Sequence, residues 1–417
     1  MRPDKSLFSN RGVCCALVLF VGAIRADADF LDDINRTFSF GDDSHRFQLS
    51  GLVDLEGYYL DQPAPGLITT NSKFLFNPRL SIFVDAQWTK HFYFFGQVRI
   101  DRGFDPSDRG AEIRLDEYFL RYAPLDNTRL NFQVGKFATV VGNWVQRHYS
   151  WQNPFVNAPL PYENLTGLWD IAAPDNTETL LYWGHVGQYD TGDYSDKYLR
   201  LPVIWGPSYA TGFAVLGFVG KFDYAAEIKN AALASRPESW DLTKTNFDNP
   251  TFSGRIGMRP NEMWNVGFSA SAGPYLRPEA APTLPAGRSI ADYRELFLGQ
   301  DVSFAWRHLQ IWAEVFETRF EVPHIGNADT LAYYIEAKYK MTPQLFIAAR
   351  WNQQFFGSVR DGGSPVRWGN NTSRIDTALG YRFTNYLQVK LQYSFTCTED
   401  NAHLGEQLLA TQVTLKF

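Results

Sequence analysis

The sequence predicts an all-β fold, a transmembrane antiparallel β-barrel of about 18 strands, with 16 as the alternative count. Three observations predict it: long segments in which apolar and polar residues alternate, connections that are short and long in turn, and an aromatic-rich chain that is polar on average. Aromatic residues make up 16% of the 417 residues, yet the mean hydropathy is −0.28. A barrel wall gives this profile because only every second residue faces lipid.

The first 28 residues predict a secretory signal peptide that is removed from the mature chain. Arg2, Lys5 and Arg11 form a basic start, an apolar run of 12 residues follows ("VCCALVLFVGAI"), and Ala26–Ala28 offer a small-x-small cleavage site. The apolar run is shorter than the ~20 residues that a membrane helix requires. We therefore expect an exported protein and set residues 1–28 aside from the fold.

Net charge and cysteine usage exclude several classes of function. The formal charge of the chain is −6, and the signal peptide itself is basic, so the mature part is more acidic still, which argues against a nucleic-acid partner. Of the three cysteines only Cys397 lies outside the signal peptide, so we expect neither a disulfide framework nor a cysteine metal cluster. The short motifs of metalloproteases, serine hydrolases and P-loop proteins are absent. We expect no enzyme, no metal and no cofactor.

Alternation with a period of two residues recurs along the chain, and it is the pattern of a β-strand with two different faces. In "LAYYIEAKYKM", apolar residues at every second position oppose Glu336, Lys338 and Lys340. Such segments run for about 9–14 residues, which matches the ~9–11 residues that cross a bilayer at a tilt. The clearest ones are 47–60, 79–88, 92–101, 331–341, 374–383, 387–395 and 409–417.

The connections between these segments alternate in length, as they do in an outer-membrane barrel with short periplasmic turns and long extracellular loops. The expected turns are 89–91, 124–127, 173–176, 221–223, 259–262, 307–308, 342–343 and 384–385. The expected loops are 61–74, 102–111, 138–166, 188–208, 233–250, 276–293, 321–330, 357–372 and 398–407. The strands near 167–173 and 223–232 alternate least clearly, and without one pair of strands the count falls to 16.

The last strand ends on Phe417, and this ending resembles the terminal signature of bacterial outer-membrane proteins. The resemblance implies that the barrel-assembly machinery recognises Phe417 and that the protein resides in the cell outer membrane, in contact with its lipid. We expect residues 29–45 to form a periplasmic lead-in and 46–417 to form the barrel.

A second resemblance lies within residues 115–144, "LDEYFLRYAPLDNTRLNFQVGKFATVVGNW". The segment resembles the phosphate-selective porin O/P family, in which a similar pair of strands precedes a long inward-folding loop. The matching residues are Gly135, Lys136, Phe137 and Gly142. The proline of the family pattern is absent, with Val140 and Val141 in its region. The resemblance implies a porin, and it does not carry over phosphate selectivity because no ladder of lumen lysines and arginines is evident.

The loop 138–166 is the longest insertion and the candidate pore constriction. It holds more aromatic residues than an exposed loop usually does, so we expect it to fold into the lumen. A plain plug, or packing between the protomers of a homotrimer, would also bury these aromatics. The candidate solute contacts are Trp144, Gln146, Arg147, His148, Tyr149 and Trp151.

Charges on the polar faces of the strands are expected to face the lumen. The candidates are Arg79, Arg99, Arg121, Arg255, Arg259, Arg350, Arg382, Lys390, Glu117 and Asp301. A slight basic excess would favour anions. Alternatively, opposite charges pair across neighbouring strands and brace the wall.

The function that follows is passive diffusion of small hydrophilic solutes through a water-filled channel, with a weak anion preference. Two alternatives stay open: a channel selective for a sugar, phosphate or an acidic polysaccharide, and a non-conducting barrel for structure or adhesion.

Overall fold

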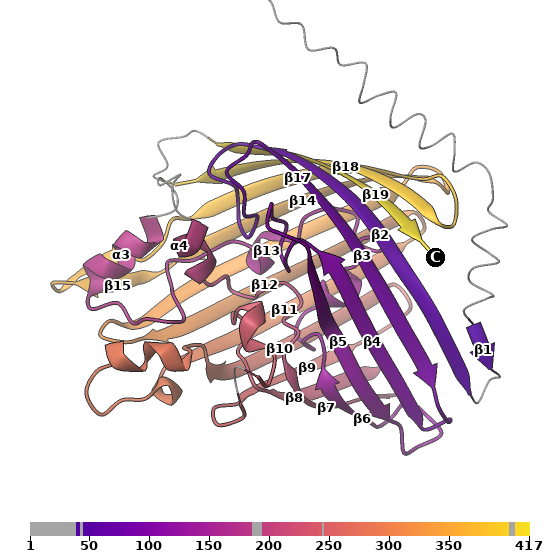
Figure 1. The fold of residues 1–417 in the computed structure, drawn as a ribbon, viewed down its shortest axis with the longest axis horizontal. Helices are drawn as coiled ribbons and strands as arrows, with labels where there is room; N and C mark the ends of the chain where they lie inside the picture. Colours follow the sequence, from indigo (N-terminus) through magenta and orange to yellow (C-terminus); the bar gives the residue numbers. More distant parts are fainter. Residues whose placement is uncertain (1–38, 42–44, 186–193, 244–245, 400–404) are drawn as a thin grey trace, which may run out of the picture.

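The computed structural model describes residues 39–41, 45–185, 194–243, 246–399 and 405–417, which form one closed antiparallel barrel of 16 strands with one extra strand (Figure 1). The predicted signal peptide lies outside the described residues. The first eight strands of the wall are β2 (Arg46–Leu60), β3 (Phe74–Gln87), β4 (Phe92–Asp101), β5 (Glu112–Tyr122), β6 (Asn131–Lys136), β7 (Thr211–Val219), β8 (Phe222–Lys229) and β9 (Thr251–Met258). The other eight are β10 (Trp264–Pro274), β11 (Arg294–Trp306), β12 (Leu309–Val322), β13 (Gly326–Lys340), β14 (Leu345–Phe356), β17 (Thr372–Arg382), β18 (Leu387–Thr398) and β19 (Glu406–Lys416).

The barrel closes where the last strand pairs with the first. β19 runs antiparallel to β2, with a register from Leu408↔Leu60 to Lys416↔Leu52. Phe417 continues the ladder, because its N–H and C=O both bond to the backbone of Gly51, at 3.0 and 2.9 Å. The extra strand β1 (Ser39–Gly41) belongs to the predicted lead-in and pairs with β2, Ser39 opposite Gln48. Closure leaves the wall no edge in the middle of the membrane.

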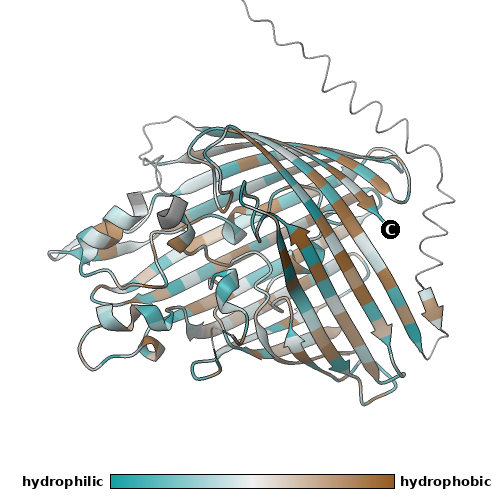
Figure 2. Ribbon diagram, in the orientation of Figure 1, coloured by the Kyte–Doolittle hydropathy of each residue, from teal (hydrophilic) through white to brown (hydrophobic). Residues whose placement is uncertain are grey.

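The alternation in the sequence is an alternation between the two sides of the wall. On β13, Ile335 is 52% exposed on the outside, whereas its neighbour Glu336 is fully buried on the inside. Figure 2 shows the same change of hydrophobic and hydrophilic residues along neighbouring strands. An outer surface of large apolar side chains around a polar interior is the arrangement that lipid requires of a barrel.

Short turns join the strands at one end of the barrel and mostly long loops at the other, with α3 and α4 at the loop end (Figure 1). We call these ends the turn side and the loop side. The prediction of a long loop at 321–330 is wrong. β12 ends at Val322 and β13 starts at Gly326, so only three residues connect these two strands. The loop between β14 and β17 holds a small hairpin, β15 (Ser358–Asp361) with β16 (Ser364–Arg367).

The chain between β6 and β7 accounts for the strand count of 16. Residues 167–173 form no strand of the barrel, and 173–176 lead into helix α3 (Thr177–His185) instead of another strand. Leu168 and Leu180 there join a buried cluster inside the molecule, so their apolar character serves packing against the barrel interior. The segment near 223–232 is a strand, β8.

Short helices complete the loops. They are η1 (Val145–Arg147), η2 (Leu160–Tyr162), α4 (Tyr194–Leu199), η3 (Pro237–Ser239), η4 (Pro278–Thr283) and η5 (Ile290–Asp292). Among the described residues, no helix has the length and apolar character needed to cross a membrane.

Candidate functional site in the barrel lumen

The chain turns into the lumen at the end of β6. Gly135 has φ +140°, and a Cβ there would lie 2.2 Å from the backbone oxygen of Tyr118, so only glycine fits this approach of two strands. Lys136 then bonds Asp241 of the next loop at 3.0 Å. Residues 138–166 follow, and we call them the inner segment.

One side of the inner segment is fixed to β12. Glu314, which is fully buried, accepts hydrogen bonds from the backbone N–H groups of Asn143 and Trp144 and, at 2.8 Å, from the Tyr162 hydroxyl. A buried carboxylate is tolerated here because several donors replace its water. Glu314 therefore holds both the beginning and the end of the segment.

Arg147 anchors the segment to β13. Its guanidinium donates to Glu336 Oε1 at 2.6 Å and to the Tyr334 hydroxyl at 3.2 Å, and it lies over the Trp312 ring at 4.3 Å from the ring centre. Glu336 also pairs with Arg350 at 3.4 Å. The two arginines share one buried carboxylate, which links the segment to the charge network of the wall.

Strands β14, β17 and β18 bind the backbone of the segment. Lys390 Nζ donates to three carbonyl oxygens, of Ser150 at 2.8 Å, Asn153 at 2.9 Å and Phe155 at 3.0 Å. Gln392 Oε1 accepts from the next two N–H groups, at 2.6 and 3.1 Å. Because buried backbone groups must find partners, the wall here takes the place of water.

The opposite wall is contacted mainly through Tyr149. Its hydroxyl donates to Gln97 Oε1 at 3.2 Å and Glu117 Oε2 at 3.3 Å, and its ring meets Phe83 edge to face at 5.3 Å. His148 Nδ1 donates to the Val145 carbonyl, and the Tyr209 hydroxyl lies 2.6 Å from Nε2. Burial lowers the pKa of His148 to about 4.

The six predicted solute contacts therefore separate into two groups. Trp144 is 4% exposed and packs on Tyr162 at 4.5 Å, which leaves little of its ring for a solute. Arg147 and His148 are used as anchors, which leaves little of either side chain for a solute. Gln146 is exposed, Tyr149 lines a cavity, and Trp151 lies between Arg382 and Lys416, at 4.9 and 5.8 Å from its ring centre.

Cavities lie on both sides of the inner segment. On the turn side a cavity of about 480 Å³ borders β3 to β6. On the loop side a cavity of about 410 Å³ lies between β5 and residues 237–241. A β-bulge at Gln97/Val98 turns two successive carboxylates inward; Asp116 lines the loop-side cavity and Glu117 the turn-side one.

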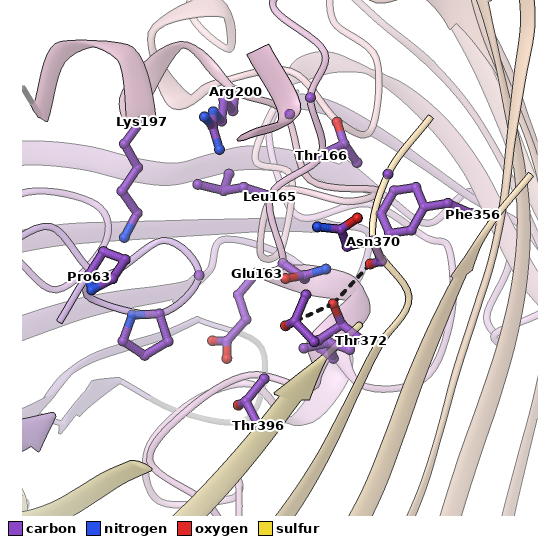
Figure 3. A pocket seen from close by; sticks show the side chains of 18 of the residues that line it. Pro63, Glu163, Leu165, Thr166, Lys197, Arg200, Phe356, Asn370, Thr372 and Thr396 are labelled. Atoms are coloured by element: carbon purple, nitrogen blue, oxygen red, sulfur yellow. Dashed lines mark hydrogen bonds between the residues drawn. The ribbon is translucent and has the colours of Figure 1, made fainter. Parts of the chain in front are cut away.

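A third, smaller cavity of about 110 Å³ lies on the loop side near β17 and β18 (Figure 3). Glu163 and Lys197 line it, and Glu163 pairs with Arg374 of the wall. Burial lowers the pKa of Lys197 to about 7, and its ammonium donates to the carbonyls of Ala64 and Ile68. Both side chains therefore already have partners within the protein, and the space that remains between them is a small polar pocket.

Half of the predicted lumen charges are paired. Arg79 meets Glu56 at 2.6 Å, and Arg99 meets Asp101 at 2.6 Å. Arg255 bridges Asp301 and Asp223, at 2.8 and 2.5 Å, and Arg350 meets Asp376 at 2.8 Å. For these residues the interpretation as bracing of the wall holds.

The remaining predicted charges differ. Arg121 donates to Gln133 and Arg382 to Gln388, and neither forms an ion pair within the described residues. Lys390 donates hydrogen bonds to backbone carbonyl oxygens, and Glu117 accepts one from the Tyr149 hydroxyl. Arg259 lies exposed in the turn after β9, its guanidinium 5.4 Å from the Phe218 ring centre, at the rim of the lumen and outside the wall strands.

Sequence reasoning missed the aromatic residues that face inward from β3 to β5. The inward-facing positions of these strands, which are otherwise mostly polar, hold Phe83, Tyr93, Phe95 and Phe119. The strict alternation along "FYFFGQVRID" could have found Tyr93 and Phe95, because Gln97 and Arg99 share their face. The sequence also did not indicate that Glu314 and Glu336 hold the inner segment, because the alternation shows only that both side chains face inward.

Comparison with solved structures agrees with this architecture. OmpF of Salmonella typhi in complex with daunomycin has a TM-score of 0.57 at 13% identity, covering 91% of this chain and 100% of that one. An anion-selective porin from Comamonas acidovorans has a TM-score of 0.54 at 9% identity, covering 89% and 99%. OmpT of Vibrio cholerae, an outer membrane protein in a trimer form, has 0.54 at 10% identity, covering 90% and 100%.

Comparison of sequences gives no family. No protein-family model matches the chain, and no curated relative matches it. The likeness of 115–144 to the phosphate-selective family thus stays a resemblance. At such low identities the solved structures show that this chain has the barrel fold of bacterial outer-membrane porins.

Proposed function

We propose that the protein is an outer-membrane channel for passive diffusion of small hydrophilic solutes. The observation that carries the proposal is the inner segment, which crosses the lumen and is bonded to the wall by side chains of β12, β13, β14, β17 and β18. A wall that supplies so many specific partners positions the segment inside the barrel as a fixed constriction. Cavities on both sides give a solute space above and below it.

The anion preference is a finer part of the proposal. On the turn side of the inner segment, the inward cations without an ion pair in the described part of the chain include Arg121, Lys338, Arg382 and Lys416. Unpaired charge of one sign near a narrow passage raises the local concentration of the opposite ion. The paired charges elsewhere contribute little to this field, so the preference is weak.

Location and partners complete the proposal. A signal peptide, export to the outer membrane, recognition of Phe417 by the barrel-assembly machinery and contact with outer-membrane lipid are consistent with the apolar outer surface. A homotrimer is consistent with the trimer form of the Vibrio cholerae protein. Kinship with the phosphate-selective porins is supported by the match around Gly135 alone.

Liposome swelling tests solute diffusion directly. Purified protein is reconstituted into liposomes, which are diluted into isotonic arabinose, glucose, sucrose or raffinose. We expect swelling that slows as the sugar grows, and none with liposomes that lack protein. Equal rates for all four sugars would contradict a fixed constriction.

A non-conducting barrel is the second candidate, because Tyr149 reaches the wall opposite the anchors and narrows the passage there. It predicts no swelling with any sugar from protein that migrates as a folded barrel on a heat-modifiability gel. A solute-selective channel predicts swelling with one solute class only.

A further inference from the structure

The lumen wall of β3, β4 and β5 carries an aromatic surface on its turn-side half. Phe95 stacks between Phe83 and Phe119, with ring centres 6.1 and 5.4 Å apart, and Tyr93 lies 6.1 Å from Phe119. The interior of a membrane barrel is normally polar. Phe83 and Phe119 are buried, whereas Tyr93 and Phe95 are half-buried and leave ring surface that a solute with a flat apolar part can cover.

Three of these rings, Tyr93, Phe95 and Phe119, line the turn-side cavity of about 480 Å³. Its aromatic lining residues are Tyr93, Phe95, Phe119 and Tyr149, and its charged ones include Arg121 and Glu117. A cavity of this size falls within the range that holds a small molecule. Ligand sites typically combine aromatic side chains with a few polar groups, and here the rings lie beside Arg121, Gln87 and Asn131.

Arg121 is the polar group without an acidic partner. Its Nε and Nη2 donate to Gln133 Oε1, at 3.0 and 2.7 Å, and neither bond uses Nη1. The guanidinium lies 5.2 Å from the Phe119 ring centre and 5.8 Å from that of Tyr93. An arginine with a spare N–H group beside an open cavity is suited to a carboxylate.

The order along β5 gives the site a direction. Glu117, Phe119 and Arg121 share the inward face, and neighbours on one face of a strand are about 6.6 Å apart. A carboxylate is attracted at the Arg121 end and repelled at the Glu117 end. A ring attached to it then lies along Phe119 and Phe95.

We propose that the turn-side cavity binds small aromatic monocarboxylates, with the carboxylate on Arg121 and the ring against Phe95 and Phe119. The inference rests on the proposed channel only in that such a solute reaches the cavity from solution. A sugar fits less well, because it needs several free acceptors for its hydroxyls, and Glu117 already accepts from Tyr149 and from the N–H of Ala138.

The test is saturation-transfer NMR of benzoate with the folded full-length protein in deuterated detergent micelles. We expect weak, reversible binding, with a Kd on the order of 1 mM, since a channel must release its solute. Cyclohexanecarboxylate has the same charge without a flat ring, benzylamine has the ring with the opposite charge, and glucose represents the sugars. We expect all three to bind more weakly than benzoate, and micelles alone to give no protein-dependent signal.

Substitutions assign the two halves of the site. Arg121→Gln should weaken benzoate binding about tenfold or more, and Arg121→Lys should restore part of it. Phe119→Leu should weaken benzoate severalfold and leave cyclohexanecarboxylate almost unchanged. Arg319→Gln is the matched control, because Arg319 pairs with Asp329 on the outer surface; it should bind benzoate as the unchanged protein does. Each variant is first checked for the heat-modifiable folded form.

Three results would overturn the proposal: no benzoate binding by the folded protein, equal binding of benzoate and cyclohexanecarboxylate, or tighter binding of glucose than of benzoate. Benzoate binding that both Arg121→Gln and Phe119→Leu leave unchanged would overturn it as well. This readout needs no ion current, so the two proposals can fail separately. Benzoate binding by a protein that does not conduct would contradict the proposed channel and support the binding site. Conduction without benzoate binding would support the channel and contradict the site.

Discussion

Replacing Lys390 by methionine should weaken the attachment of residues 150–158 to the wall. Lys390 is 1% exposed, and its ammonium holds three carbonyl oxygens of residues 150–155. Methionine has nearly the same length and no donor, so the substitution keeps the packing and leaves the three carbonyls without this partner.

The magnitude follows from the bonds lost. A hydrogen bond from a charged donor contributes about 1.5–3 kcal/mol, so three give an upper limit of about 9 kcal/mol. Removing a buried charge recovers several kcal/mol of desolvation. We therefore expect the local free energy of opening of residues 150–158 to fall by about 2–4 kcal/mol. At 1.4 kcal/mol per tenfold, hydrogen exchange there should accelerate roughly 30- to 700-fold.

Hydrogen exchange followed by mass spectrometry measures this opening peptide by peptide. Exchange in β13 and β19 should stay unchanged, because the strand ladders do not depend on Lys390. Lys340→Met is the control, since Lys340 is exposed at the end of β13. Unchanged protection of residues 150–158 in Lys390→Met would refute the role of Lys390 as an anchor of the segment.

Three further predictions concern the passage, acidity and closure. Tyr149→Ala should raise the conductance, because Tyr149 is the main side chain of the inner segment that reaches β4 and β5, whereas Tyr149→Phe should change it little; equal conductance of all three proteins would argue for another passage. The pKa of His148 is about 4 in the closed segment and near 6.5 when the side chain is exposed, so protonation favours the open segment. Protection of the segment against hydrogen exchange should be full above pH 6.5 and fall as the pH drops towards 4. His148→Gln should remove this pH dependence. Deleting Phe417 removes two backbone hydrogen bonds to Gly51 and should lower both the refolding yield and the heat-modification temperature, and unchanged values would contradict its role in closure.

The barrel itself could be predicted because its signals are local. Each strand must place apolar side chains in lipid, so β13 and β18 can be recognised from their own alternation. The chain from 137 to 210 could not be predicted in the same way. Leu168 and Leu180 are apolar because they pack on distant residues inside the barrel, and a period of two carries no information about such contacts.

The site was predicted at the level of the segment and less well at the level of residues. Aromatic density indicated that 138–166 would be buried, yet it could not tell Trp144, which packs on Tyr162, from Tyr149, which borders a cavity. That distinction depends on which strand lies opposite each side chain. The position of the segment in the lumen is set by Glu314 and Lys390, which lie on strands more than 150 residues away in the sequence.

Single-channel recording in a planar bilayer under a salt gradient tests the central claim most directly. For refolded protein in KCl, we predict stepwise openings with a reversal potential displaced towards that of chloride, reduced when Arg121, Lys338, Arg382 and Lys416 are neutralised together. Openings with a cation preference would contradict the assignment of the turn-side cations. No openings from protein that is folded on a heat-modifiability gel would contradict the channel itself.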